Sequence, residues 1–178
     1  MTLLFHLLSI PVGYVYAVAL EWAVHRYIFH EVGKRFRPLG FHWHQHHRAT
    51  TLHRGADPSY GGSVLTWSAH GREFWGVALG ALIHLPVLWF APGAYLAAIL
   101  SGLNYTRLHR KAHLDPQWCR EHLPWHWDHH MGRNPDANWC VTSDWFDRLM
   151  GTRVPGPASP RVERERNHGP GDAPRLSA

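Results

Sequence analysis

The apolar residues of this 178-residue chain are gathered into two long stretches. Residues 1–20 and residues 74–106 contain no Lys, Arg, Asp or Glu, which gives uncharged runs of 20 and 33 residues. A helix of about 20 apolar residues is long enough to cross the hydrocarbon of a bilayer. The pattern therefore predicts membrane helices in both stretches, although the mean hydropathy of the whole chain is −0.31.

The first stretch predicts one long helix from residue 2 to about residue 30, with Gly33 as a plausible stop. His25 and His30 lie five positions apart, which is about 140° around an ideal α-helix. They can face the same way only if the helix ends or bulges between them, and we expect His30 on the exit turn. Ala17-Val18-Ala19 resembles a signal-peptide cleavage site, but no basic segment precedes it and the helical pattern continues, which favours a retained membrane helix.

The second stretch is interrupted by Ala91-Pro92-Gly93, a turn sequence. A hairpin with arms at 74–90 and 94–106 would return the chain to its starting side, and the second arm would continue past the membrane. Residues 63–73 are mildly amphipathic and predict a segment at the membrane interface. His84 falls within the first arm, and we expect a neutral imidazole that is hydrogen-bonded inside the bundle.

Two short helices follow. Asp115-Pro116 is typical of a helix start and predicts a helix over 116–122, and Pro124 starts another that ends at Gly132. The predicted fold is an all-α integral membrane protein with three to four membrane helices, one N-terminal span plus a hairpin, capped on the cytoplasmic side by short helices. Residues 1–152 form one domain, and residues 153–178, rich in Pro, Gly, Ser and Arg, predict a disordered tail.

The net charge of +5 raises the question of nucleic-acid binding, and the placement of the charges argues against it. All 18 Lys and Arg residues lie within 26–72 and 107–175, so none lies in the apolar spans or in the turn between the two arms of the hairpin. This asymmetry is typical of multi-pass membrane proteins whose basic segments are cytoplasmic. We therefore expect a multi-pass protein of the cell inner membrane, with its histidines and C-terminus in the cytoplasm and no nucleic-acid partner.

Histidine carries the candidate chemistry. Of 17 histidines, six fall between His109 and His130, and several pairs lie three or four positions apart, on one helix face. Imidazole is the commonest metal ligand among side chains, so such clusters indicate metal binding. His42 and His44 remain alternatives, whereas His53, His122 and His168 are not expected to bind metal. The candidate ligands are His25, His30, His42, His44, His46, His47, His109, His113, His126, His129 and His130.

About ten imidazoles exceed what one tetrahedral ion requires, so we predict two metal ions with an open position. With few carboxylates and no Cys cluster, two irons are chemically reasonable, and zinc or manganese would also accept imidazole. Metal-bound His normally donates its second N–H to an outer acceptor. The nearest carboxylates in sequence are Glu21, Asp128, Asp144 and Asp147.

These residues resemble the fatty acid hydroxylase and sterol desaturase superfamily, the membrane-bound histidine-motif oxygenases. The matching segments cover roughly residues 20–152, nearly all of the predicted domain. They are Glu21-Trp22…His25-Arg26-Tyr27…His30, His46-His47, Asn104-Tyr105…His109…His113, Pro124-Trp125-His126…His129-His130-Met131-Gly132, and Asn138-Trp139…Ser143-Asp144-Trp145-Phe146-Asp147-Arg148…Gly151-Thr152. One departure is Trp43, which stands where the family's His-x-x-His-His motif has its first histidine.

The resemblance implies a membrane enzyme with two iron ions that uses O2 and two external electrons to oxidise a C–H bond of a lipid. Such an enzyme would take its lipid from the bilayer. Because no cytochrome b5-like segment is present, its electrons would come from a separate donor of the ferredoxin or cytochrome b5 type. Zinc could occupy the sites in a purified preparation.

Within the superfamily, hydroxylation of a fatty acid or acyl lipid is the first hypothesis, and carotenoid ring hydroxylation or lipid desaturation is the alternative. Two hypotheses come from other classes of protein. A metal transporter would place ligands within the spans, where the sequence offers only His6 and His84. A bis-His haem protein would need two histidines that face each other across spans.

Overall fold

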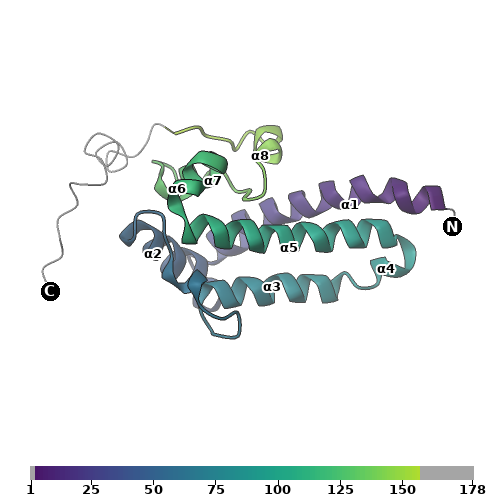
Figure 1. The fold of residues 1–178 in the computed structure, drawn as a ribbon, viewed down its shortest axis with the longest axis horizontal. Helices are drawn as coiled ribbons and strands as arrows, with labels where there is room; N and C mark the ends of the chain where they lie inside the picture. Colours follow the sequence, from purple (N-terminus) through teal and green to yellow (C-terminus); the bar gives the residue numbers. More distant parts are fainter. Residues whose placement is uncertain (1–2, 157–178) are drawn as a thin grey trace, which may run out of the picture.

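Three long helices form the body of the molecule. The computed structural model describes residues 3–156, and every regular element in that range is helical. The long helices are α1 (Leu3–Ala23), α3 (Ala69–Ile83) and α5 (Pro92–Leu114), and α5 lies between the other two (Figure 1). The predicted all-helical fold is therefore confirmed.

The short elements gather mainly at the end of the bundle where α5 finishes, and the N-terminus and α4 (Val87–Phe90) lie at the other end (Figure 1). Helix α8 (Trp145–Leu149) instead packs beside α1. The elements of the crowded end are η1 (Val24–Val32), η2 (Arg37–Leu39), η3 (His42–His46), α2 (His47–Leu52), η4 (Pro58–Gly61), α6 (Pro116–His122) and α7 (Pro124–Met131).

The hairpin forms, but its boundaries differ from the prediction. Helix α3 begins at Ala69, because the Ser68 hydroxyl accepts from the Gly71 N–H as an N-cap. Residues 69–73 are therefore the first turn of a bundle helix, and the position of segment 63–73 at the membrane interface stays a prediction. Helix α3 already ends at Ile83, and Pro92 is the first residue of α5 rather than the centre of the turn. Proline fits a first helical position because its missing N–H is not needed there.

Other local predictions are confirmed. Helix α6 starts at Pro116, with the Asp115 carboxylate accepting from the Trp118 N–H, and α7 ends before Gly132. The His84 imidazole lies between two partners: it donates to the Gly80 carbonyl at 2.7 Å and accepts from the Tyr16 hydroxyl at 2.6 Å. His84 is thus a satisfied residue of the bundle, as expected.

The sides of the bundle are apolar. Leu4, Leu82 and Leu96 are 63%, 67% and 56% exposed, whereas the largest buried side chains are mostly imidazoles. Among residues 3–156, one helical segment, Leu4–Val32, is long and apolar enough to cross a membrane. A signal sequence or a core helix of a soluble protein meets the same criterion, but only 22% of its most apolar window is buried, unlike a core helix.

The segment Leu4–Val32 is also part of the folded structure. The Trp22 indole N–H donates to the Thr152 hydroxyl at 3.0 Å, and the Glu21 carboxylate accepts from the backbone N–H groups of Val141 and Thr142. A segment removed as a signal peptide would take these contacts away. Of the predicted tail 153–178, the structure describes residues 153–156, where the Arg153 guanidinium donates to the Asp128 carboxylate at 3.1 Å. The rest of the tail, including His168, lies outside the described residues.

Helices α1 and α5 approach closely at a glycine. A Cβ atom added to Gly13 would lie 2.2 Å from the Ala94 carbonyl oxygen and 2.5 Å from its Cα. Both of these atoms belong to backbone, so relief requires the two helices to move apart.

Gly13→Ala is therefore expected to destabilise the protein by about 1–3 kcal/mol through overpacking. Gly76→Ala is the matched control, because a Cβ at Gly76 in α3 meets nothing within 4 Å. There the higher helix propensity of Ala should stabilise by up to about 1 kcal/mol. Thermal unfolding followed by circular dichroism measures both, and equal shifts for the two variants would contradict the close approach.

Candidate metal centre

Two π-helices carry one set of histidines. In a π-helix the backbone hydrogen bond joins residue i to residue i+5, so residues five apart lie near one face. His25 and His30 belong to η1, and their ring centroids are 5.2 Å apart. His42 and His47 are joined by η3, where the His47 N–H donates to the His42 carbonyl, and their rings are 5.0 Å apart. The alternative of a bulge between His25 and His30 is confirmed.

Two α-helices carry pairs with the ordinary spacing of four. His109 and His113 lie on α5 with ring centroids 4.6 Å apart, and His126 and His130 lie on α7, also 4.6 Å apart. All four side chains are buried. Helix α5 thus continues past its apolar part to deliver a ligand pair, as predicted from the sequence.

The imidazoles form two groups, in each of which one nitrogen per residue lies within 4.8 Å of the others. His126 adjoins the second group, because its Nε2 lies 3.1 Å from the His113 Nε2. Group one consists of His25, His30, His42, His47 and His129, and group two consists of His46, His109, His113 and His130 together with His126. The neighbours His46 and His47, and likewise His129 and His130, contribute one member to each group.

Seven of the ten imidazoles turn their Nδ1 atoms outward to a carbonyl or carboxylate acceptor. Three imidazoles donate to backbone carbonyls: His25 to Trp139, His113 to Gly55 at 3.0 Å, and His129 to Ala137 at 2.7 Å. Four others contact carboxylates: His30 meets Asp136, His42 and His109 meet Glu73, and His46 meets Asp57. An acceptor at Nδ1 fixes the proton there, so that the Nε2 of the neutral ring presents a lone pair.

The Nε2 atoms of neighbouring rings lie close together. The Nε2–Nε2 distances are 2.9 Å for His25–His42, 3.0 Å for His30–His47, 3.1 Å for His47–His129 and 3.1 Å for His113–His126. Two ligands at right angles on one ion, each with a metal–nitrogen bond of about 2.1 Å, have their nitrogens about 3.0 Å apart. The observed distances match this spacing, and where both Nδ1 atoms meet acceptors, as for His25 and His42, no proton is left to bridge the Nε2 atoms.

Group two also contains buried nitrogens without a hydrogen-bond partner in the described part of the chain, namely the Nε2 atoms of His46, His109 and His130 and the Nδ1 atom of His126. An unpaired buried polar atom costs free energy unless something binds it. The residues present therefore fit metal ions, which would accept these lone pairs.

Burial keeps the rings neutral. Desolvation lowers the pKa of His42 and His113 to about 3 and the pKa of His129 to about 4. Desolvation also lowers the pKa of His109 to about 4, although the Glu73 carboxylate opposes it. At neutral pH these lone pairs are free of protons, the state that a metal ligand requires.

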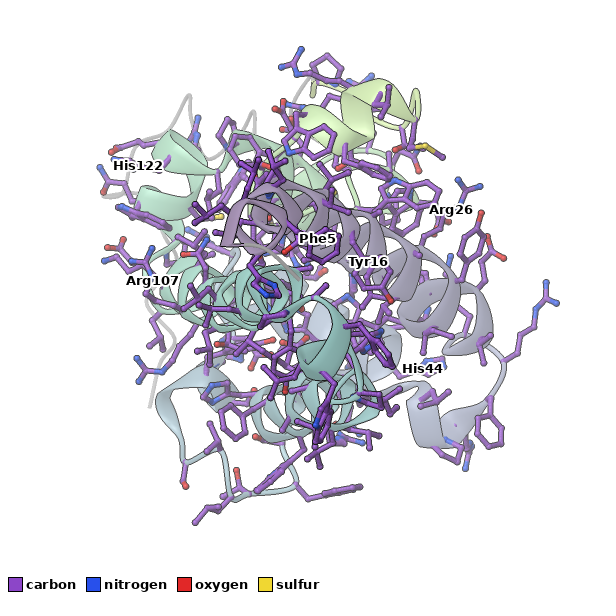
Figure 2. The ribbon with its side chains drawn as sticks, turned by 90° about the vertical axis from the view of Figure 1, so that its right-hand side faces the viewer. Phe5, Tyr16, Arg26, His44, Arg107 and His122 are labelled. Carbon is purple, nitrogen blue, oxygen red and sulfur yellow. The ribbon has the colours of Figure 1, made fainter. Side chains whose placement is uncertain are left out.

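The structure distinguishes the histidines that join the two groups from those that lie outside them. Of the alternatives His42 and His44, the structure brings His42 into group one, and His44 is exposed; the inclusion of His44 among the ligands is therefore wrong. Figure 2, which looks along the bundle, shows His122 at its edge. His53 is exposed as well, so the exclusion of His53 and His122 agrees with their positions.

The structure corrects the prediction of the carboxylates that accept from the imidazoles. None of the hydrogen bonds of Glu21, Asp128, Asp144 or Asp147 goes to an imidazole in residues 3–156. Proximity along the chain was a poor guide, because the acceptors come from the loops and from α3. The carboxylates that contact imidazoles are Asp57, Glu73 and Asp136. Glu73 had a sequence signal: it is the only acidic residue between Asp57 and Asp115 and adjoins the long uncharged stretch.

Two of the predicted carboxylates hold the backbone of a segment that itself supplies an acceptor to an imidazole. Asp147 accepts from the backbone N–H groups of Trp139 and Cys140, and Glu21 accepts from those of Val141 and Thr142. Together they hold the segment whose Trp139 carbonyl accepts from His25. The Trp139 ring lies 4.8 Å from that of His30, so the aromatic segment packs against the histidines.

Comparisons with known proteins add no assignment. No family model, no curated protein and no solved structure matches the chain. The chemistry of the site is therefore argued from its geometry.

The neighbours His42 and His44 provide a direct test of the metal centre. His42→Ala removes a buried group-one nitrogen, so the affinity for one of two bound ions should fall at least about tenfold. His44→Ala removes an exposed ring and should leave both ions bound. Metal counting after anaerobic loading with Fe²⁺ and dialysis against a chelator measures this, and equal metal content in the two variants would disprove the grouping.

Proposed function

We propose that the protein is a membrane-embedded di-iron oxygenase that inserts one oxygen atom from O2 into a C–H bond of a lipid acyl chain. The observation that carries this proposal is the pair of adjoining imidazole groups, with Nε2 atoms at the spacing of neighbouring ligands on one ion. Ten imidazoles exceed the four ligands of a closed structural zinc site. Two redox-active ions in an almost wholly nitrogen environment suit oxygen chemistry.

Iron bound in both groups would supply the reductive activation of O2. The overall balance is R–H + O2 + 2 electrons + 2 protons → R–OH + H2O, with the electrons from a separate donor of the ferredoxin or cytochrome b5 type. The chain's own residues hold the imidazoles in one tautomer through their Nδ1 partners and keep the buried groups away from water. This is the positioning and exclusion that a protein contributes to metal chemistry.

The surface supports a lipid environment for this chemistry. The long helices turn apolar side chains outward, and residues 3–20 and the connection between α3 and α5 carry no charged residue. The basic residues nearest the bundle, such as Arg72 and Arg107, lie instead toward the end with the short helices. We infer a multi-pass protein with its metal end in the cytoplasm, which is the arrangement that the positive-inside rule favours.

The rival classes of protein fit this geometry less well. A transporter needs ligands along the spans, whereas His84 is hydrogen-bonded to Tyr16 and Gly80. The two axial nitrogens of a bis-His haem lie on opposite sides of the iron, about 4 Å apart. The Nε2 pairs at 2.9–3.1 Å fit neighbouring ligands on one ion instead.

The oxygenase proposal predicts that His129→Ala, and likewise His126→Ala, abolishes product formation while the protein still accumulates. His122→Ala is the control, because His122 is an exposed histidine on the neighbouring helix α6. Cells expressing each variant are grown under ¹⁸O2, and their lipids are analysed by mass spectrometry. A lipid with one ¹⁸O atom in cells with wild type and His122→Ala alone supports the proposal.

Other outcomes of this experiment would indicate other functions. Loss of two hydrogens from a lipid would identify a desaturase, and label on a carotenoid ring would identify a carotenoid hydroxylase. Labelled lipid in cells with both His126→Ala and His129→Ala would contradict the role of the metal centre. A strong Soret band in the purified protein would instead identify a haem protein.

Membrane insertion is tested separately. The apolar sides of the bundle predict that the protein stays in the pellet when membranes are washed with alkaline carbonate and is released by detergent. Mass spectrometry of the purified protein should find residues 1–30 still attached, since His25 and His30 belong to group one. Release by carbonate, or loss of this segment, would contradict the proposal.

A further inference from the structure

Glu73 is a buried carboxylate that touches both groups of histidines. Its side chain is 3% exposed and lies in the first turns of α3. The His42 Nδ1 of group one lies 3.2 Å from Oε1, and the His109 Nδ1 of group two lies 2.8 Å from Oε2. The Tyr60 hydroxyl also donates to Oε2, at 2.6 Å. Among residues 3–156, it is the one carboxylate with hydrogen bonds to imidazoles of both groups.

From this geometry we propose that Glu73 is a positioning residue shared by the two metal sites, whose two oxygens keep one ligand of each site ready to bind. The proposal rests on the metal binding assumed in the proposed function. Each oxygen accepts a proton-bearing Nδ1, and each acceptance leaves the opposite Nε2 with its lone pair toward its own group. A carboxylate acceptor also raises the basicity of the imidazole that donates to it.

The two oxygens are not equivalent, and this gives the substitution Glu73→Gln a predictable direction. Glutamine keeps one acceptor oxygen and replaces the other by a donor NH2 group. The oxygen should stay on the side of Oε2, where the Tyr60 hydroxyl and His109 both donate. The NH2 group then faces the His42 Nδ1, which can accept only if its proton moves to Nε2, and a protonated Nε2 cannot bind metal.

Glu73→Gln is therefore expected to lower the affinity of group one for its ion by about 10- to 100-fold, the usual effect of losing a hydrogen-bond partner of a metal ligand. Glu73→Ala removes both acceptors and should lower the affinity of both groups for their ions. Asp57→Asn is the single-site comparison, because Asp57 contacts only His46 of group two among the imidazoles. Asp144→Asn is the neutral control, since the Asp144 carboxylate pairs with Arg148 and Arg153 and contacts no imidazole.

The measurement is anaerobic titration of the purified full-length protein with Co²⁺, followed through the visible absorption of the bound ion and a competing chelator. Wild type and Asp144→Asn should bind two ions tightly, Glu73→Gln one, and Glu73→Ala none. In a His113→Ala background, which impairs group two, Glu73→Gln should leave no tight ion. Circular dichroism shows that each variant is folded, and the isosteric Glu73→Gln keeps the test valid if Glu73→Ala does not fold.

Each result of the titration supports or overturns the role of Glu73 or the oxygenase proposal. Two tight ions in Glu73→Gln or in Glu73→Ala would overturn the shared role of Glu73, while the oxygenase proposal would stand. Fewer than two tight ions in wild type would overturn both proposals. Two tight ions in wild type, with the expected losses in the variants but no oxidised lipid in cells, would support the role of Glu73 and refute the oxygenase.

Discussion

The structure depends on one electrostatic constraint: ten neutral imidazoles turn their lone pairs toward two small spaces. Two lone pairs at a short distance, as at the 2.9 Å between the Nε2 atoms of His25 and His42, repel unless a cation lies between them, so these rings need partners that hold them in place. Those partners come from distant parts of the chain, including the carbonyls of Gly55, Ala137 and Trp139. The loops around the metal centre are thus shaped by the acceptors that they must supply.

The spacing of the histidines made much of this arrangement predictable. Pairs four apart indicated α-helical faces at His109 and His126, and the structure confirms both. The interval of five between His25 and His30 required either a helix end or a bulge, and the same interval separates His42 from His47. This second interval would have favoured His42 over His44, because a π-helix aligns residues five apart.

The rest could not be read from the sequence for identifiable reasons. Acceptors at Nδ1 need only one hydrogen bond each, and no periodicity marks a lone Asp57 or Asp136. Glu73 lacks a periodicity too, and its one signal was its position as the only acidic residue between Asp57 and Asp115. The position of the hairpin turn was misjudged because Pro92 fits both a turn and the first turn of a helix. The apolar sides of the long helices were foreseeable from the two uncharged stretches, but which short helices would cover the histidines depended on tertiary contacts.

The outer partners make the two groups electrostatically different. Group two has the Asp57 carboxylate, which is 4% exposed, and it shares Glu73, which is 3% exposed. Group one shares Glu73 too, but its other carboxylate partner, Asp136, is 51% exposed and is also paired with Lys34. Because water and a lysine screen Asp136, uncompensated negative charge is concentrated around group two. Two ions of the same element would therefore experience different fields, although imidazole is the ligand in both groups.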